Sequence, residues 1–403
     1  MEEKLLLALA VSVLAVAVAV AVITKRVSWA ARPKRNQPPG PWTLPVIGSI
    51  HHLVRSHSIQ RSMRTLAEEH GPLMQIWLGE VPAVVVSSPE AAREGLRNHD
   101  LAFADRYVST TIATIYLGGR DLAFAPYGER WRQLRKLCTQ ELLTAARVRS
   151  FRRVREEEVA RLVRGLAASA TAGDAVNLTE KIAQLVNDVV VRCCIGGRSK
   201  HRGEFLDALR AALSQVTWLT VADVFPSSKL ARIVGTAPRK ALACRKKIER
   251  ILEQIIQERK QIKEESTSTG APMAAGNECF LDVLLRLQEE GDTPIPITNE
   301  TIMLLLHDMF SAGSETSSTT LIWTMAELIK SPRVMTKANL EVRQVFEGNK
   351  AITDDEIAKL SYLKMVIKES LRMHCPVPLL GPRKCVRHAR LWAMAYPRAL
   401  SCL

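Results

Sequence analysis

An uninterrupted apolar stretch lies close to the start of this chain, over residues 5–23, with Ser12 as its only polar side chain. A helix of this length spans roughly 28 Å, about the thickness of the hydrocarbon core of a bilayer. The stretch is long for the apolar part of a cleaved signal peptide, and it is preceded by the acidic residues Glu2 and Glu3 rather than by basic ones. We therefore expect residues 1–24 to form a retained N-terminal transmembrane helix, with a cleaved signal peptide as the alternative.

Basic residues follow the apolar stretch directly, at Lys25, Arg26, Arg32, Lys34 and Arg35. Positive charge marks the cytosolic end of a membrane helix, so the domain that follows is expected in the cytosol. These residues also contribute to a formal net charge of +15, which a nucleic-acid-binding protein would carry as well. Because no nucleic-acid-binding motif occurs elsewhere, we expect contact with anionic membrane lipid and no nucleic acid as a partner.

Residues 25–48 combine this basic charge with several prolines, among them Pro38, Pro39 and Pro41. Proline disfavours helix and favours an extended, stiff backbone. We interpret the segment as a hinge between the anchor and a catalytic domain, and an ordinary linker is an equal alternative. The eight cysteines of the chain form no C-x-x-C pair, so neither a zinc site nor a disulfide framework is expected.

The pattern after the hinge is mainly helical. Residues 73–78 and 83–87 are short β-rich runs around Gly79 and Pro82, and they predict a hairpin. Helical periodicity then predicts helices over residues 129–145, 148–167, 179–194, 239–263, 281–290, 298–329, 337–345, 353–359 and 361–374. The fold class expected is therefore mainly α, with a small β region near the N-terminus.

Two motifs on these helices suggest chemistry. Trp131 and Arg135 are four positions apart on one helical face, and an indole donor beside a guanidinium suits a carboxylate or phosphate. Gly313, Glu315 and Thr316 interrupt the long apolar helix, where glycine costs about 1 kcal/mol relative to alanine. We interpret the interruption as a local widening beside a bound ligand, with Glu315 and Thr316 placed to deliver protons. A kink with solvated side chains is the alternative.

A third motif pairs Glu369 with Arg372, an acid–base spacing that is common on helices and says little alone. The three motifs occur in a fixed order with the anchor, the hinge, Phe103, Arg106 and the prolines after residue 375. Together they resemble a plant A-type, microsomal cytochrome P-450, a haem-thiolate monooxygenase. The resemblance extends to about Cys385, and it implies that residues 49–385 form an incomplete domain of the cytochrome P-450 fold.

The resemblance implies haem b as the cofactor. It assigns the binding of the haem propionates to Trp131, Arg135 and Arg383. It assigns proton delivery during oxygen activation to Thr316 and Glu315. These five residues are the expected cofactor-binding and catalytic groups.

Two further sets of residues follow from the resemblance. Glu369 and Arg372 would support the haem-binding core structurally. The substrate pocket would include Ala312, Gly313, Val377 and Leu379. The substrate expected is a small apolar specialised metabolite, such as a terpenoid, oxidised with O2. Electrons would come from an NADPH–cytochrome P-450 reductase whose acidic face suits a basic surface, at the endoplasmic reticulum membrane.

One part of the family pattern has no match here. The family binds iron through the cysteine of a Phe-x-x-Gly-x-Arg-x-Cys-x-Gly loop. Cys385 has Gly381 and Arg383 at the right spacing, but Pro378 stands where phenylalanine is needed and Arg387 where glycine is needed. No axial cysteine ligand is therefore expected, and the C-terminal part of the fold is expected to be missing.

Residues 386–403 match nothing in the family and are interpreted as an aberrant tail. Their codons, read in a shifted frame, allow Gly-Tyr-Gly-Ile-Pro-Lys-Gly, which resembles the family segment expected there, so a frameshift or misplaced splice junction is our hypothesis. Two other interpretations stay open for this chain. One is a catalytically inactive truncated product, and the other is a membrane-anchored helical interaction protein.

Overall fold

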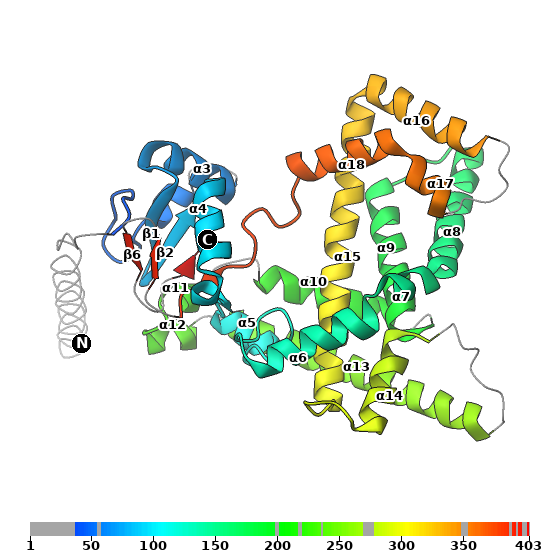
Figure 1. Cartoon of the computed structure of the whole chain (residues 1–403), viewed down its shortest axis with the longest axis horizontal. Helices are drawn as coiled ribbons and strands as arrows, with labels where there is room; N and C mark the ends of the chain where they lie inside the picture. Colours follow the sequence, from blue (N-terminus) through cyan, green and yellow to red (C-terminus); the bar gives the residue numbers. More distant parts are fainter. Residues whose placement is uncertain are drawn as a thin grey trace, which may run out of the picture. The chain divides into compact units, whose positions relative to one another are not determined.

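A computed structural model of the chain (Figure 1) describes residues 37–54, 58–197, 201–216, 220–234, 237–268, 278–347, 354–386, 389–391, 394–396 and 401–402. The predicted anchor lies outside these residues. Among the helices of the described part, none is both long and apolar enough to cross a membrane. The chain divides into two compact units, one made of residues 1–114, 216–241 and 379–403 and the other of residues 115–215 and 242–378.

The first unit holds the β structure. Strands β1 (Leu73–Leu78) and β2 (Val81–Val86) form an antiparallel hairpin in which Leu73 lies opposite Val86, so the predicted hairpin is confirmed. The sheet has the order β1-β2-β7-β4-β3, where β3 is Asp105–Arg106, β4 is Arg383–Lys384 and β7 is Ser401–Cys402. β7 runs parallel to β2 and antiparallel to β4. A second sheet pairs β5 (Ala389–Leu391) with β6 (Met394–Tyr396).

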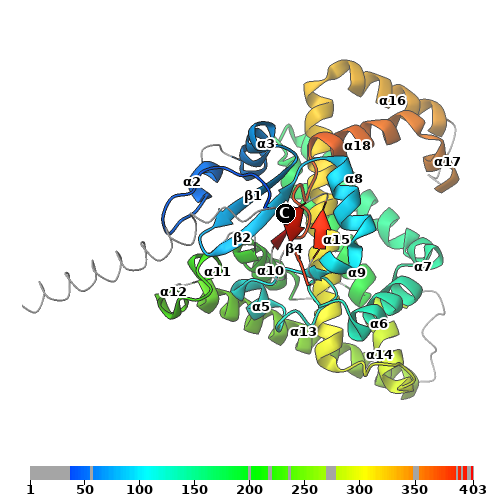
Figure 2. The same cartoon turned by 60° about the vertical axis from the view of Figure 1, so that its left-hand side comes forward.

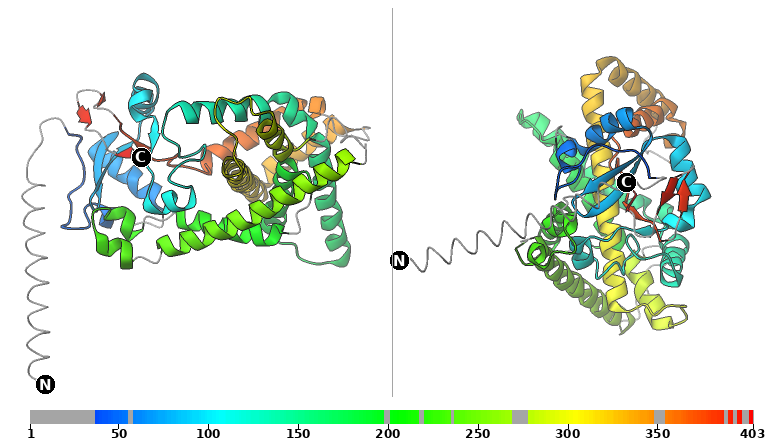
Figure 3. Two further views of the ribbon diagram at one scale, coloured as in Figure 1. Left: turned by 90° about the horizontal axis from the view of Figure 1, so that it is seen from below. Right: turned by 90° about the vertical axis from the view of Figure 1, so that its left-hand side faces the viewer.

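Short helices accompany this sheet: α2 (Ile50–Leu53), α3 (Ile59–His70), α4 (Pro89–Arg93), a π-helical turn η1 (Glu94–Asn98), a 3-10 turn η2 (Asp100–Phe103), α5 (Thr110–Ile115), α11 (Val221–Val224) and α12 (Lys229–Val234). Figure 3 shows α3 beside the β1–β2 hairpin. Met63 and Leu66 of α3 are buried against Met74 and Ile76 of β1, because their spacing puts them on one helical face.

The second unit is helical in its described part. Its helices are α6 (Glu129–Leu137), the π-helical turn η3 (Cys138–Leu142), α7 (Ala145–Ser150), α8 (Arg152–Ala172), α9 (Leu178–Ile195), α10 (Arg202–Val216), α13 (Ala237–Ser268), α14 (Phe280–Glu290), α15 (Asn299–Lys330), α16 (Pro332–Phe346), α17 (Asp354–Lys359) and α18 (Ser361–Met373). The mainly α class with a small β region is therefore confirmed.

Helix α15 is the central element of this unit. Its first turn is capped by Thr298, whose hydroxyl accepts a hydrogen bond from the Thr301 amide at 3.2 Å. It ends at Ser331, before the proline that opens α16. Helix α9 packs along it, and Figures 1 and 2 show α16 and α18 near its C-terminal end. Phe310 is fully buried in α15 and contacts the ring of Phe205 at a centroid distance of 4.8 Å.

Some predicted helix boundaries are wrong. The single helix predicted over residues 129–145 is divided into α6, η3 and the start of α7, because Thr144 leaves the helical conformation to cap α7. Helix α8 begins after Phe151 and continues to Ala172, where Gly173 ends it with a left-handed φ of 74°. Helix α13 reaches Ser268, beyond its predicted end at residue 263.

Candidate functional site

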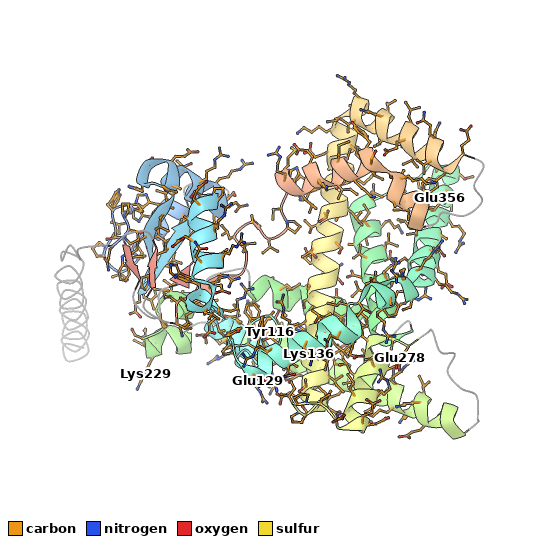
Figure 4. The ribbon with its side chains drawn as sticks, viewed as in Figure 1. Tyr116, Glu129, Lys136, Lys229, Glu278 and Glu356 are labelled. Carbon is orange, nitrogen blue, oxygen red and sulfur yellow. The ribbon has the colours of Figure 1, made fainter. Side chains whose placement is uncertain are left out.

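Helix α6 carries the first predicted anion-binding pair. The guanidinium carbon of Arg135 lies 5.2 Å from the centre of the Trp131 ring, in a cation–π contact. Figure 4 labels Glu129 and Lys136 toward the two ends of this helix. Arg135 is exposed and has no carboxylate partner among the described residues, so its donors are available to an anion. The role of the pair in binding a haem propionate stays a prediction.

The third predicted propionate ligand, Arg383, lies in the first unit. It stands in β4 directly opposite Arg106 of β3. Arg383 donates a hydrogen bond to the Phe103 carbonyl at 3.0 Å, and Arg106 donates one to the Gly381 carbonyl at 2.9 Å. Burial and the neighbouring charge of Arg383 lower the pKa of Arg106. Like charges opposed across a ladder are unfavourable unless an anion balances them, so the two guanidiniums suit a carboxylate.

The structure thus adds Arg106 to the candidate site. In the sequence, Arg106 stood out only as part of a supporting motif. Its local pattern could not show that it pairs with Arg383, which lies 277 positions later. Trp131 and Arg135 belong to one compact unit, and Arg106 and Arg383 belong to the other.

The polar interruption of α15 leaves the helix regular. Residues 299–330 form one continuous α-helix, so the predicted widening is absent from it. The Thr316 hydroxyl donates to the carbonyl of Ala312 at 2.6 Å, which satisfies it within the helix. A Cβ atom at Gly313 would lie 3.3 Å from Val190 in α9, so the glycine allows the two helices to pack closely. Glu315 is exposed to solvent.

The other predicted site residues lie further along the chain. Arg372 binds Glu369 through two hydrogen bonds of 2.6 and 2.8 Å, and both side chains of this α18 pair are more than half exposed. Val377 is exposed and belongs to the second unit. Leu379 belongs to the first unit, where it packs against the core formed by α3, β1 and β2. The residues predicted for the substrate pocket thus fall in both units, and their role stays a prediction.

A cavity does open within the second unit, between α13 (the long green helix in Figure 3), the chain after α5, and the first half of α15. Its volume is small, about 30 Å³. Its apolar lining includes Ile115, Leu117, Ile248, Leu252, Met303 and Leu304. His307 is its one buried polar residue, and burial lowers the pKa of this imidazole to about 4. Arg245 and Glu249 also line the cavity, which is far smaller than the roughly 300–1,000 Å³ of ordinary ligand pockets.

A buried pair of acidic residues was missed by the sequence analysis. Asp121 and Asp308 are almost fully inaccessible to solvent in the second unit. A signal was present, since Asp308 interrupts an apolar helix as conspicuously as Glu315 does. The partner could not be found that way, because it lies in a loop far away in the sequence.

The cysteine nearest to the family's ligand pattern is placed as a core residue. Cys385 is 0% exposed and packs among Leu73, Val84, Ala91 and Phe103 in the first unit. Among the described residues, no cluster of three or more His, Cys, Asp or Glu side chains could hold a metal ion. The described residues therefore offer groups for haem propionates, whereas the cysteine nearest to the family's ligand pattern is buried, so they fit a haem-thiolate centre only in part.

Comparison with known proteins identifies the group to which the chain belongs. Residues 38–391 match the Cytochrome P-450 family. The chain is 59% identical to an ent-isokaurene C2/C3-hydroxylase of Oryza sativa subsp. japonica, over 100% of this chain and 78% of the relative. It is 60% identical to an ent-cassadiene hydroxylase of the same organism, over 94% of this chain and 74% of the relative. It is 51% identical to a dolabradiene monooxygenase of Zea mays, over 99% of this chain and 77% of the relative.

A solved structure shows the same fold. A zebra fish cytochrome P-450 determined with progesterone superposes with a TM-score of 0.71 at 21% identity, covering 84% of this chain and 76% of its own. The mainly helical architecture with small sheets is thus the cytochrome P-450 fold, whose cofactor is haem. On the match to the family and the identity to plant hydroxylases, this chain belongs to the cytochrome P-450 monooxygenases of plants.

Proposed function

We propose that this chain has the scaffold of a terpenoid hydroxylase, most similar in chemistry to enzymes that oxidise diterpene hydrocarbons, but cannot by itself supply the axial thiolate. The relatives of this chain support the substrate class. Those at 51–60% identity are described as hydroxylases or a monooxygenase of ent-isokaurene, ent-cassadiene and dolabradiene. A hydrocarbon skeleton is recognised mainly by apolar contact.

The position of Cys385 carries the proposal about the thiolate. A haem ligand must face the cofactor, whereas this sulfur is fully buried among aliphatic and aromatic side chains of the sheet. Buried structural cysteines of this kind are inert. We infer that Cys385 is a core residue and is not the ligand of a haem iron.

The residues for the rest of the haem site are retained. Haem supplies oxygen activation when it is bound in this family. The chain's own contribution would be to hold the two propionates, through Arg135 stacked on Trp131 and through the opposed pair Arg106 and Arg383. These side chains can bind carboxylates whether or not an axial ligand is present. Thr316 and Glu315 keep their predicted role in proton delivery as part of this proposal.

The cellular setting is likewise part of the proposal. The apolar stretch of residues 5–23 followed by basic residues supports anchoring to the endoplasmic reticulum membrane. The formal net charge of +15 and the basic residues after the apolar stretch support an arrangement in which an acidic reductase is the electron donor. A purely structural, haem-independent interaction protein would need neither this arrangement nor the opposed arginines.

A chimera tests the proposal. Residues after Cys385 are replaced by the corresponding and following residues of the rice ent-isokaurene hydroxylase, and both proteins are expressed with a plant reductase in microsomes. We expect the native chain to form no oxidised product from ent-isokaurene or ent-cassadiene, and the chimera to oxidise at least one of them. Hydroxylation by the native chain would contradict the loss of the thiolate. A haem-loaded chimera that oxidises no diterpene would contradict the proposed substrate class.

The same chimera tests whether the opposed arginines Arg106 and Arg383 help to bind haem. Replacing Arg106 and Arg383 by glutamine in the chimera is expected to lower its haem content at unchanged expression. Replacing Arg164, an arginine of α8 outside the candidate site, by glutamine provides the matched control. Equal haem content in the three proteins would contradict the role of the opposed arginines.

A further inference from the structure

Two carboxyl groups meet inside the second unit, outside the candidate haem-binding residues. Asp121 lies in the loop that leads from α5 to α6, and Asp308 lies in the first half of α15. Their exposed fractions are 0% and 7%. The two groups lie close enough to affect each other's protonation. The loop, from Tyr116 to Gly128, therefore contacts the central helix through a pair of acids.

The hydrogen bonds around the pair are unequal. The Leu122 amide donates to the Asp308 carboxyl oxygen Oδ2 at 2.8 Å. Two ionised carboxylates would each require hydrogen-bond donors. Neither carboxyl oxygen of Asp121 receives a hydrogen bond from an N–H or O–H group of the described residues. Burying two carboxylates side by side without donors is strongly unfavourable. A proton on one of them converts an acceptor into a donor and removes the conflict.

No cation within the cluster offers another solution. The titratable groups that face the pair are Tyr116 from the loop, Cys138 from η3 and His307 from α15. Burial raises the pKa of Tyr116 above its ordinary value and that of Cys138 to about 12, so both are neutral near pH 7. Burial lowers the pKa of His307 to about 4, so it is neutral as well. Figure 4 labels Tyr116 at the start of this loop.

The nearest arginine of the loop is occupied elsewhere. Arg120 forms an ion pair with Glu300 of α15 at 2.8 Å, in which the Arg120 side chain is 56% exposed. This pair neutralises itself at the protein surface and leaves no charge to balance the two buried acids. Apart from the Leu122 amide that binds Asp308, the partner that remains for each carboxyl group is the other one.

We propose that Asp121 and Asp308 share a single proton at neutral pH, and that this shared proton fastens the loop of residues 116–128 to helix α15. The Leu122 hydrogen bond then completes the contact. Burial and the neighbouring charge of Asp121 keep the pKa of Asp308 well above its ordinary value, and burial raises the pKa of Asp121 to about 6. Both directions favour retention of a proton by the pair.

The pair would act as positioning residues for the monooxygenase site. Asp308 lies eight residues before Thr316 on one helix, which is about 12 Å along the axis. The loop leads directly into α6, which carries Trp131 and Arg135. The contact therefore fixes the start of α6 relative to α15. This role does not depend on whether the chain supplies a thiolate, and it is testable without haem.

The experiment uses the full chain in detergent or lipid nanodiscs. Hydrogen exchange of the peptide containing Leu122 is followed by mass spectrometry from about pH 6 to about pH 9 and corrected for intrinsic exchange. When the pair loses its shared proton, the two carboxylates repel each other and the loop separates from α15. Protection of this peptide from hydrogen exchange in the native chain should therefore fall about tenfold over that pH range. Infrared spectra should show a protonated carboxyl band at pH 7.

Variants make the test specific. Asp308→Asn retains an acceptor for Leu122 and provides a permanent N–H donor to Asp121, so we expect full protection without pH dependence and loss of the infrared band. Asp308→Ala removes both functions and should leave the peptide unprotected at every pH. Asp292→Asn, at an exposed aspartate, is the matched control and should behave as the native chain. The proposal is overturned if the native chain lacks the carboxyl band, or if Asp308→Asn keeps the pH dependence or loses protection.

Discussion

Replacing Cys385 by serine tests directly whether this sulfur is a core residue. The side chain is fully inaccessible and contacts Leu73, Val84, Ala91 and Phe103. Serine brings a hydroxyl into this apolar cluster, and burial of a poorly satisfied hydroxyl costs about 1–3 kcal/mol. We therefore expect Cys385→Ser to lower the free energy of unfolding by about 2 kcal/mol, and Cys385→Ala to lower it by about 1 kcal/mol through the smaller cavity.

The assay is urea unfolding of the full chain followed by circular dichroism and tryptophan fluorescence. Cys375 is exposed and provides the matched control, for which Cys375→Ser should change the stability by less than about 0.5 kcal/mol. In the native chain, iodoacetamide followed by peptide mapping should label Cys375 rapidly and leave Cys385 unlabelled. The reasoning is refuted if Cys385→Ser is as stable as the native chain, or if the two thiols react at similar rates.

Other predictions concern packing and ion pairs. Arg259 binds Asp282 through contacts of 2.6 and 2.7 Å in a largely buried pair, so Arg259→Met should cost about 3 kcal/mol in urea unfolding; a loss below about 1 kcal/mol would contradict a buried pair. Burial opposes ionisation of Asp282, but hydrogen bonds from Arg259 outweigh it and lower its pKa. This stabilisation is present above the ordinary aspartate pKa and is lost as the pH falls toward the folded value, so an acid titration of stability should be less steep in Arg259→Met. Gly313→Ala should change stability by less than about 1 kcal/mol, whereas Gly313→Leu should lose about 2 kcal/mol against Val190, and equal effects would refute the close helix approach. Glu369→Gln should leave the unfolding midpoint unchanged, because the pair it breaks is exposed, and a clear shift would show that α18 depends on it.

Local sequence signals predicted the central helix well. The predicted range of residues 298–329 differs from the observed α15 by one residue at each end, because Thr298 caps it and Pro332 follows it. The hairpin at Gly79 was found for the same reason, since its turn and strand signals are adjacent in sequence. Such elements are determined by residues within a few positions of one another.

Long-range arrangements could not be predicted in this way. The Asp121–Asp308 pair joins a loop to a helix 187 positions later, and the opposed arginines join β3 to β4. The glycine of the α15 interruption was interpreted as a ligand-side feature, whereas its neighbour Val190 provides a packing reason for it. Each of these depends on a partner that only the folded chain brings near.

The most direct test of this account is the reduced carbon-monoxide difference spectrum of the full chain expressed with added haem precursor. We predict that the spectrum lacks the band of a thiolate-ligated haem, because Cys385 is buried in the sheet core and no other part of the sequence matches the ligand loop. A strong thiolate-type band in the native chain that disappears in Cys385→Ala would contradict it.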